Sequence, residues 1–117
     1  MKLSIIIPCY NEKDTILKVV ENIHAIYKNE KEIIIIDDFS SDGSRDLLIK
    51  NADKLKYHLK LNDKNYGKGF CIKEGIKKVT GDFTIIQDAD LEYDIRDYNN
   101  LLKPIIDNQA DVVFGSR

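Results

Sequence analysis

The chain has 117 residues, of which 43% are hydrophobic and 32% are charged, and its formal net charge is −2. This composition is typical of one globular domain with a hydrophobic core. The charge balance provides no basic footprint for nucleic acid and no polybasic membrane patch, so we expect no nucleic-acid partner.

The chain begins with Met1 and an apolar run at residues 3–7, which Pro8 closes. This run is too short to cross a bilayer, and it does not form a signal peptide. The two cysteines, Cys9 and Cys71, lie far apart and in no metal-binding spacing, which favours two buried free thiols in a reducing compartment. We therefore expect a soluble, cytoplasmic protein.

Short, isoleucine-rich runs recur along the chain and predict β-strands. Most of them are apolar throughout rather than alternating, which is typical of strands that are buried on both faces of a parallel sheet. The predicted strands cover residues 3–7, 32–36, 83–86 and 111–114, and a more polar strand is predicted at 56–61.

Segments of helical periodicity lie between these strands. In the first of them, apolar residues recur at roughly i, i+3, i+4 and i+7, and Asn11 or Asp14 can cap the helix. A second helix is predicted to begin after Gly43, where Ser41 or Asp42 can serve as the cap.

A third helix is predicted at about residues 67–79, with Gly81 as the glycine that follows its C-terminus. Within it, Gly75 is expected to permit close packing of the helix on the sheet. A fourth helix spans roughly residues 95–108, and Pro104 should break or kink it.

Strands that alternate with helices predict a mostly parallel sheet with helices on both faces, a Rossmann-like α/β layer. No internal repeat, low-complexity segment or linker interrupts the pattern, so residues 1–117 are expected to belong to a single domain. The chain stops just after its last predicted strand, and we therefore expect that this domain is truncated.

Polar clusters follow four of the predicted strands, at the edge of a parallel sheet where ligands bind. The first β–α turn, at residues 8–14, contains no glycine, and the chain has no P-loop. The remaining option is a nucleotide that is held by side chains, with a metal ion at its diphosphate. The four clusters are residues 8–12, 37–44, 88–90 and 115–117.

The cluster Asp88-Ala89-Asp90 comes almost directly after an apolar strand. Hard carboxylate oxygens suit Mg²⁺ or Mn²⁺, and such a site needs only one or two carboxylates besides phosphate oxygens. On its own, an Asp-x-Asp sequence is also typical of a solvated acidic turn. Its interpretation therefore depends on the motifs around it.

Five motifs, in this order and spacing, resemble glycosyltransferase family 2, and most closely its polyprenyl-phosphate sugar transferases. Each motif is weak alone, but together they cover essentially the whole chain. The resemblance implies the GT-A fold, which is a Rossmann-like α/β layer. The motifs are IIPCYNE at residues 6–12, IIDDFSSDGS at 35–44, NYGKG at 65–69, QDADLEYD at 87–94 and DVVFGSR at 111–117.

The resemblance implies a nucleotide-sugar pocket that the first motifs help to line. Pro8, Tyr10 and Glu12 would line it, with Tyr10 offering its ring and hydroxyl to the base or ribose. Asp38 would accept a hydrogen bond from a ring N–H of the base, with Asp37 beside it.

The resemblance also implies how the diphosphate and its metal ion are bound. Asp90 would bind Mg²⁺ or Mn²⁺, and Asp88 the ribose or the same ion, with Ala89 between them; Glu92 could reach the ion as well. Two basic residues would meet the donor phosphates. Lys68 would act as a point charge near the phosphates or base, and Arg117 as a planar fork.

The implied function is that of an inverting, metal-dependent glycosyltransferase. It would transfer a sugar from a UDP- or GDP-linked donor to a polyprenyl phosphate at the cytoplasmic face of a membrane, or to a glycan. The catalytic general base is expected beyond Arg117.

Two other interpretations stay open. One is a truncated, catalytically inactive remnant that at most binds a nucleotide. The other is a receiver-like signalling module, which would need a phospho-acceptor aspartate on the third strand and a lysine after the fifth. The third strand ends in Leu61-Asn62-Asp63, and no lysine follows the fifth.

Overall fold

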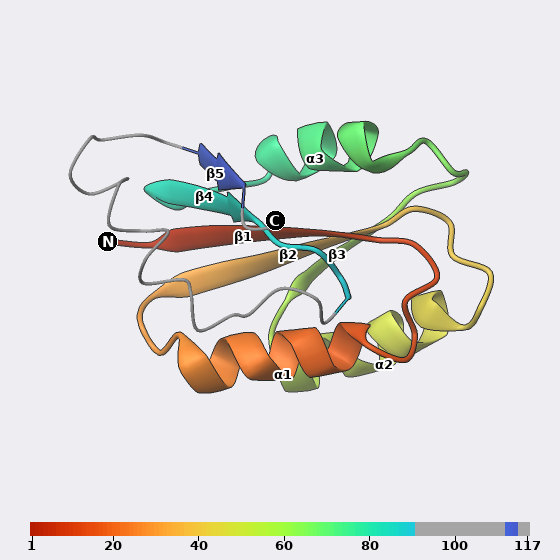
Figure 1. The fold of residues 1–117 in the computed structure, drawn as a ribbon, viewed down its shortest axis with the longest axis horizontal. Coiled ribbons are helices and arrows are strands. Elements are labelled where there is room, and N and C mark those ends of the chain that lie inside the picture. The colour runs from red at the N-terminus through yellow and green to blue at the C-terminus, as the bar shows by residue number, and fades with distance from the viewer. Residues whose placement is uncertain (91–111, 115–117) are drawn as a thin grey trace.

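A parallel five-stranded sheet lies at the centre of the structure, a computed structural model that describes residues 1–90 and 112–114 (Figure 1). The strands are arranged in the order β3-β2-β1-β4-β5, and every neighbouring pair is parallel. All five predicted strands are therefore confirmed. Their bounds are Leu3–Cys9 for β1, Lys31–Asp37 for β2, His58–Leu61 for β3, Phe83–Ile86 for β4 and Val112–Phe114 for β5.

Helices cover both faces of this sheet, as the sequence predicts. α1 (Ile16–Ile26) and α2 (Ser44–Leu55) lie on one face, and α3 (Lys68–Ile76) lies on the other (Figure 1). None of the helices in the described part of the chain has the length and hydrophobicity of a membrane-spanning segment. The helix predicted at 95–108, with Pro104, lies outside the described residues.

The isoleucine runs bury side chains on both faces because successive residues of a strand point to opposite sides. On β1, Ile5 and Ile7 join one buried cluster with residues of α1 and α2. On β2, Ile34 and Ile36 form a second cluster with Cys71 of α3. Burying each of these side chains stabilises the fold by about 1.5–3 kcal/mol, so β1 and β2 carry much of the core.

Gly75 lies at a close contact between α3 and the sheet, which confirms the packing predicted for it. A Cβ atom at this position would lie 2.6 Å from Cγ2 and 3.0 Å from Cδ1 of Ile6. Real Cβ atoms essentially never approach another heavy atom this closely. Glycine is therefore required by the contact between helix and sheet.

The caps predicted for the first helix are wrong. Thr15 is the residue at the N-terminal boundary of α1, and neither Asn11 nor Asp14 caps the helix. Asn11 has a positive φ of 53°, and its Oδ1 accepts a hydrogen bond from Ser41 N at 2.7 Å. Its side chain thus joins two turns that are far apart in sequence, which local sequence patterns do not reveal.

The start of α2 is closer to the prediction. Gly43 occupies the boundary position, but Asp42 Oδ1 accepts a hydrogen bond from Ser44 N at 2.9 Å. Asp42 therefore satisfies an amide at the helix N-terminus, as a capping side chain does.

The end predicted for α3 is wrong. The helix ends at Ile76, and Gly81 is not the glycine that follows its C-terminus. Gly81 instead lies against the start of β1, where an added Cβ would be 2.5 Å from Ser4 Oγ and 2.8 Å from Lys2 O. Its role is a close approach of two backbone segments rather than helix termination.

Candidate functional site

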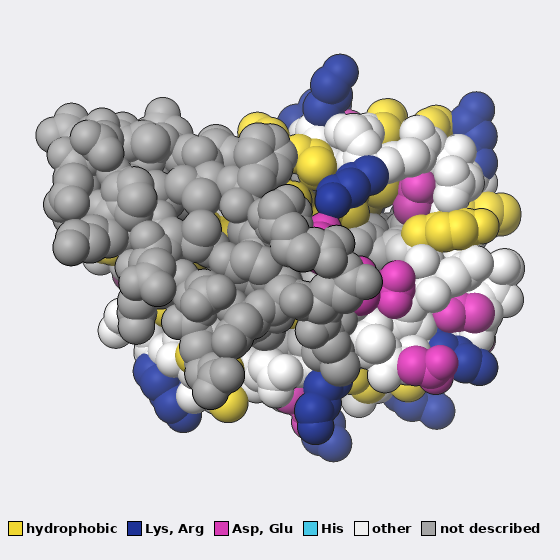
Figure 2. Space-filling view, viewed as in Figure 1, with side chains coloured by type: hydrophobic (Ala, Val, Ile, Leu, Met, Phe, Trp, Pro, Cys, Tyr) yellow, Lys and Arg dark blue, Asp and Glu magenta, His cyan; other side chains and the backbone are white. Residues whose placement is uncertain are grey.

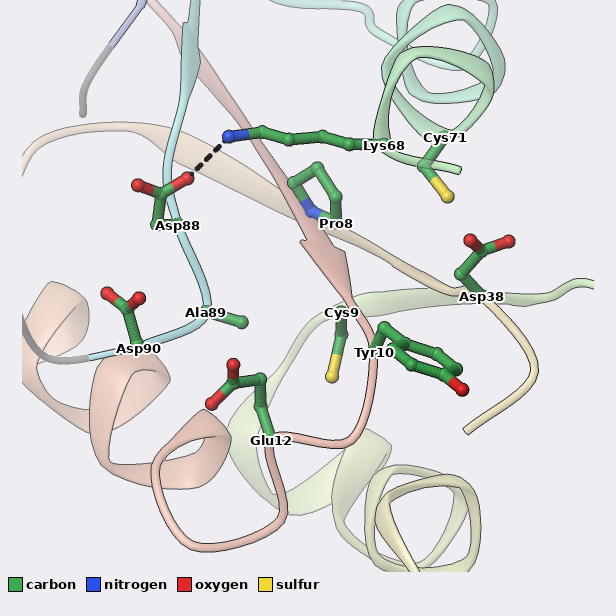
Figure 3. Close-up of a pocket in the computed structure, with 10 residues that line it drawn as sticks. All are labelled: Pro8, Cys9, Tyr10, Glu12, Asp38, Lys68, Cys71, Asp88, Ala89 and Asp90. Carbon is green, nitrogen blue, oxygen red and sulfur yellow. Dashed lines mark hydrogen bonds and ion pairs between the residues drawn. The ribbon is translucent and has the colours of Figure 1, made fainter. Parts of the chain in front are cut away.

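A cavity of about 290 Å³ opens at the carboxyl ends of β1, β2 and β4 (Figure 3). The end of β1 and the turns after β1, β2 and β4 supply most of its lining, and the start of α3 completes it. All of the lining residues except Cys9 and Cys71 are ones that the sequence predicts for a ligand site. The lining consists of Pro8, Cys9, Tyr10, Glu12, Asp38, Lys68, Cys71, Asp88, Ala89 and Asp90.

The sheet register explains why these distant segments meet. β1 and β2 pair in parallel from Leu3↔Lys31 to Cys9↔Asp37, so both strands end at the same edge. β4 pairs with the other side of β1, which places Asp88 and the residues after it at that edge. The predicted gathering of polar clusters is confirmed for three of them; the fourth, at residues 115–117, lies outside the described residues.

The cavity has two ends of different chemistry. Asp88 and Asp90 lie at one end, and Tyr10 and Asp38 lie at the other, with Pro8 between them (Figure 3). Tyr10 is 48% exposed, so part of its ring is available for contact with a planar group. Carboxylates thus lie at both ends of the cavity.

An ion pair crosses the cavity at its acidic end. Lys68 Nζ lies 2.8 Å from Asp88 Oδ1, and both side chains remain partly exposed (Figure 3). Exposed pairs of this kind contribute about 0–1 kcal/mol and are readily broken. The lysine is therefore available to an anionic ligand that enters the cavity.

Thr15 links the start of α1 to the acidic end. Its hydroxyl lies 3.0 Å from Glu12 Oε2 and 2.9 Å from Ala89 O, so its one proton is donated to either acceptor. Sequence reasoning does not single out Thr15, because nothing in its neighbourhood indicates that residue 89 will lie beside it.

Asp38 is nearly buried, and its carboxylate accepts hydrogen bonds from the chain itself. The donors are Tyr66 N at 2.9 Å, Gly67 N at 2.8 Å and Asn62 Nδ2 at 2.9 Å. Burial alone would raise the pKa of Asp38, but these hydrogen bonds outweigh it and hold the pKa below its usual 3.8. The carboxylate is thus ionised and braces the β3–α3 loop.

Asp37 does not line the cavity, although it is predicted beside Asp38. It is fully buried and accepts hydrogen bonds from Ser40 N at 3.0 Å and Ser40 Oγ at 2.7 Å. Arg45 Nη1 lies 3.3 Å from its carboxylate and donates to Asn62 O at 2.8 Å. Asp37 therefore shapes the turn after β2, and its predicted contact with a nucleotide stays untested.

The two cavity cysteines are both free and buried, as the sequence predicts. Burial raises the pKa of Cys9 to about 12, and the negative charge of Asp37 acts in the same direction. Burial also raises the pKa of Cys71 to about 12, with a further contribution from Asp38. Both thiols are therefore protonated and poorly nucleophilic, and they line the cavity as small apolar groups.

Within residues 1–90 and 112–114, no group of three or more histidine, cysteine or acidic side chains could hold a metal ion. The cavity does bring Asp88 and Asp90 to one end, and all-oxygen donors of this kind suit Mg²⁺ or Mn²⁺. Two carboxylates suffice where phosphate oxygens and water complete the coordination. Glu92 and Arg117, the other predicted ligand-binding residues, lie outside the described residues.

Sequence comparison identifies relatives of the chain. The family model described as glycosyl transferase family 2 matches residues 4–117. An undecaprenyl-phosphate 4-deoxy-4-formamido-L-arabinose transferase of Photorhabdus laumondii is 36% identical over 121 aligned positions, covering 99% of this chain and 37% of the relative. The protein of that name from Yersinia enterocolitica is 40% identical over 96 positions, covering 78% of this chain and 29% of the relative. The chain thus spans about a third of these relatives' length.

Solved structures with the same fold are also found. The mannosyltransferase PcManGT of Pyrobaculum calidifontis, solved with GDP-Man and Mn²⁺, superposes with a TM-score of 0.78 at 26% identity, over 88% of this chain and 32% of that one. S. aureus TarS residues 1–349, solved with UDP-GlcNAc, superposes with a TM-score of 0.76 at 24% identity, over 95% and 33% of the two chains.

Proposed function

Because the chain belongs to glycosyl transferase family 2, we propose that residues 1–117 form the N-terminal, nucleotide-sugar-binding part of a GT-A sugar transferase domain. The observation that carries this proposal is the cavity at the carboxyl edge of the sheet, where a lysine and several carboxylates from different strands meet. The first β–α turn has no glycine and the chain has no P-loop, so in this proposal side chains bind the nucleotide.

The donor in this proposal is a nucleoside-diphosphate sugar, linked to either uridine or guanosine. Its base lies at the end formed by Tyr10 and Asp38, and its diphosphate lies toward Lys68 and Asp88. The two solved structures described above are compatible with either base, since PcManGT was solved with GDP-Man and TarS with UDP-GlcNAc. Arg117 would add a second positive charge near the phosphates.

Asp90, with Asp88 beside it, would hold Mg²⁺ or Mn²⁺, with Glu92 as a further candidate ligand. The bound ion would stabilise the negative charge of the departing nucleoside diphosphate. Two carboxylates at one end of the cavity fit this role because the diphosphate supplies the remaining oxygens. The structure of PcManGT, solved with GDP-Man and Mn²⁺, supports a divalent ion in the proposed site.

The reaction in this proposal is an inverting transfer. An oxygen of the acceptor bonds to C1 of the sugar as the bond from C1 to the diphosphate breaks, and the nucleoside diphosphate departs. The acceptor is a polyprenyl phosphate at a membrane surface, because the two sequence relatives are named as undecaprenyl-phosphate sugar transferases. A phosphate acceptor is already ionised, whereas a hydroxyl acceptor would need a general base from beyond Arg117.

Calorimetric titration of the 117-residue chain with UDP and with GDP, with and without Mn²⁺, tests the donor site. We expect Mn²⁺-dependent binding of one nucleotide and loss of that dependence in Asp90→Ala. The matched control is Asp14→Ala, which removes an exposed aspartate outside the cavity. A folded chain that binds neither nucleotide would favour the inactive remnant, and unchanged Mn²⁺ dependence in Asp90→Ala would remove the metal assignment.

A further inference from the structure

Asp38 is connected to the opposite end of the cavity through the backbone of the β3–α3 loop. Its two carboxylate oxygens accept hydrogen bonds from the consecutive amides of Tyr66 and Gly67. The next residue is Lys68, which begins α3 and reaches across the cavity to Asp88. A continuous chain of contacts therefore runs from the proposed base end to the proposed phosphate end.

The loop at this point is hydrogen-bonded to Asp38. Gly67 has a positive φ of 100°, a backbone conformation that residues other than glycine rarely adopt. Its amide points at the Asp38 carboxylate instead of at solvent or a carbonyl. Asn62 at the end of β3 donates to the same carboxylate, so the loop is held at both of its ends.

The hydrogen bonds of Asp38 leave little capacity for other partners. An ionised carboxylate offers about four acceptor sites; Asn62, Tyr66 and Gly67 occupy three of them, and the Cys71 thiol also donates to this carboxylate. A role limited to the base of the nucleotide would not require these backbone contacts. These contacts instead hold the two residues that directly precede Lys68, and so connect Asp38 with the position of the lysine.

We propose that Asp38 is a positioning residue for the donor diphosphate, which acts by fixing the Tyr66–Gly67 backbone and thereby the reach of Lys68. The proposal rests on the proposed function, since it takes the anionic ligand to be a nucleoside diphosphate. It adds a second task to the base contact predicted for Asp38. Without the carboxylate, the Tyr66 and Gly67 amides would lose their hydrogen-bond acceptor, and Lys68, which follows them, would contact the phosphates less often.

The test uses a ligand that has no base. Inorganic pyrophosphate with Mg²⁺ is titrated by ³¹P NMR into the wild-type chain, Asp38→Asn, Lys68→Met and the double variant. We expect Asp38→Asn and Lys68→Met each to weaken pyrophosphate binding about tenfold, which is the scale of one charge-assisted contact. In the double variant, Asp38→Asn should add no further loss, because residues that act through one another are not additive.

Each outcome decides the proposal. Loss of pyrophosphate affinity in Asp38→Asn that disappears in the Lys68→Met background supports it. A loss confined to UDP or GDP, an additive loss in the double variant, or a wild-type chain that does not bind pyrophosphate would each overturn it. Failure of the proposed function is separate, because it is seen in the wild-type chain as absent binding of both nucleotides.

Two further variants keep the test valid if Asp38→Asn folds poorly. Gly67→Ala leaves Asp38 intact but strains the loop, because its φ is 100° although the space around it is open. Gly67→Ala should lower pyrophosphate affinity when Lys68 is present and should have no further effect in Lys68→Met. If the losses of affinity from the two substitutions add, the proposal is overturned. Asp63→Asn is the matched control, since Asp63 lies in the same loop, is exposed and accepts a hydrogen bond from the hydroxyl of Tyr66, whereas the Tyr66 and Gly67 amides donate to Asp38.

Discussion

At the scale of single residues, Gly75 shows how a side chain can be excluded by packing alone. The helix would gain about 1 kcal/mol from alanine in place of glycine if nothing lay nearby. At this position the added methyl group would meet Ile6 at 2.6 Å. The clash should therefore outweigh the helix propensity.

We predict that Gly75→Ala lowers the free energy of unfolding by about 1–3 kcal/mol, the usual cost of overpacking a core. Urea denaturation of the two proteins measures the difference. The matched control is Gly69→Ala in the same helix, where an added Cβ meets nothing within 4 Å and should be neutral or slightly stabilising. A Gly75→Ala protein as stable as the control would show that α3 can shift away from the sheet at little cost.

At the scale of secondary-structure elements, Glu32 joins three segments at the edge of the sheet opposite the cavity. Its carboxylate accepts hydrogen bonds from Ser4 Oγ at 2.6 Å, Thr80 N at 2.5 Å and Thr80 Oγ1 at 3.0 Å. Lys2 Nζ lies 3.6 Å away. The starts of β1 and β2 and the segment before β4 are therefore held together by one side chain.

These contacts make the stability of the fold depend on pH. Burial alone would raise the pKa of Glu32, but its hydrogen bonds and Lys2 outweigh burial and lower the pKa below its usual 4.5. A carboxylate whose pKa is lowered by folding stabilises the folded state fully above its unfolded-state pKa. This stabilisation is lost as the pH falls through the lower, folded-state pKa.

We predict that Glu32→Gln lowers the free energy of unfolding by about 1–2 kcal/mol at neutral pH, because the amide offers one acceptor where the carboxylate offers two. The difference from the wild-type protein should narrow as the pH falls below the usual glutamate pKa of 4.5. Urea denaturation of both proteins, from neutral pH to below pH 4.5, measures the difference in the free energy of unfolding. A difference that stays constant with pH would mean that the Glu32 charge does not contribute.

The elements differ in how well the sequence predicts them. Strands were predictable because a sheet buried on both faces requires continuous apolar runs, such as that of β2. Helix ends were harder to predict. Asn11 and Gly81 are residue types that often cap helices, but here each contacts a segment that is distant in sequence. Such contacts depend on the finished fold, and no local pattern encodes them.

At the scale of the whole molecule, the strand order explains why the candidate site could be predicted as a set. Parallel strands direct all of their carboxyl ends to one edge, so polar residues after β1, β2 and β4 had to meet. The individual roles were harder to predict. Asp37 and Asp38 are adjacent in sequence, but only Asp38 lines the cavity, because alternation along the chain sends Asp37 into the interior.

Size alone does not identify the site. A second cavity, of about 660 Å³, lies at the opposite edge of the sheet and is larger than the candidate site of about 290 Å³. Its lining is Glu32, Ile34, Ala52, Tyr57, His58, Leu59, Lys78 and Thr80. Its one carboxylate is already engaged by Ser4 and Thr80, whereas Asp88 and Asp90 lie together with Lys68 in the cavity at the carboxyl edge.

The distribution of charge over the surface does not identify the site either. On the face shown in Figure 2, basic and acidic side chains are interspersed over the described surface. The formal net charge of −2 is also small. In the proposed function, recognition of an anionic donor would therefore depend on individual residues such as Lys68 rather than on a broad positive field.

The most direct test of the central claim is to map the nucleotide site by NMR. The ¹⁵N-labelled chain would be titrated with UDP and with GDP in the presence of Mg²⁺, and amide shifts followed residue by residue. We predict that one nucleotide shifts the amides of Tyr10, Lys68, Ala89 and Asp90, which surround the cavity at the carboxyl edge. Shifts confined to Tyr57, His58 and Thr80 in the second cavity, or no shifts with either nucleotide, would contradict the claim.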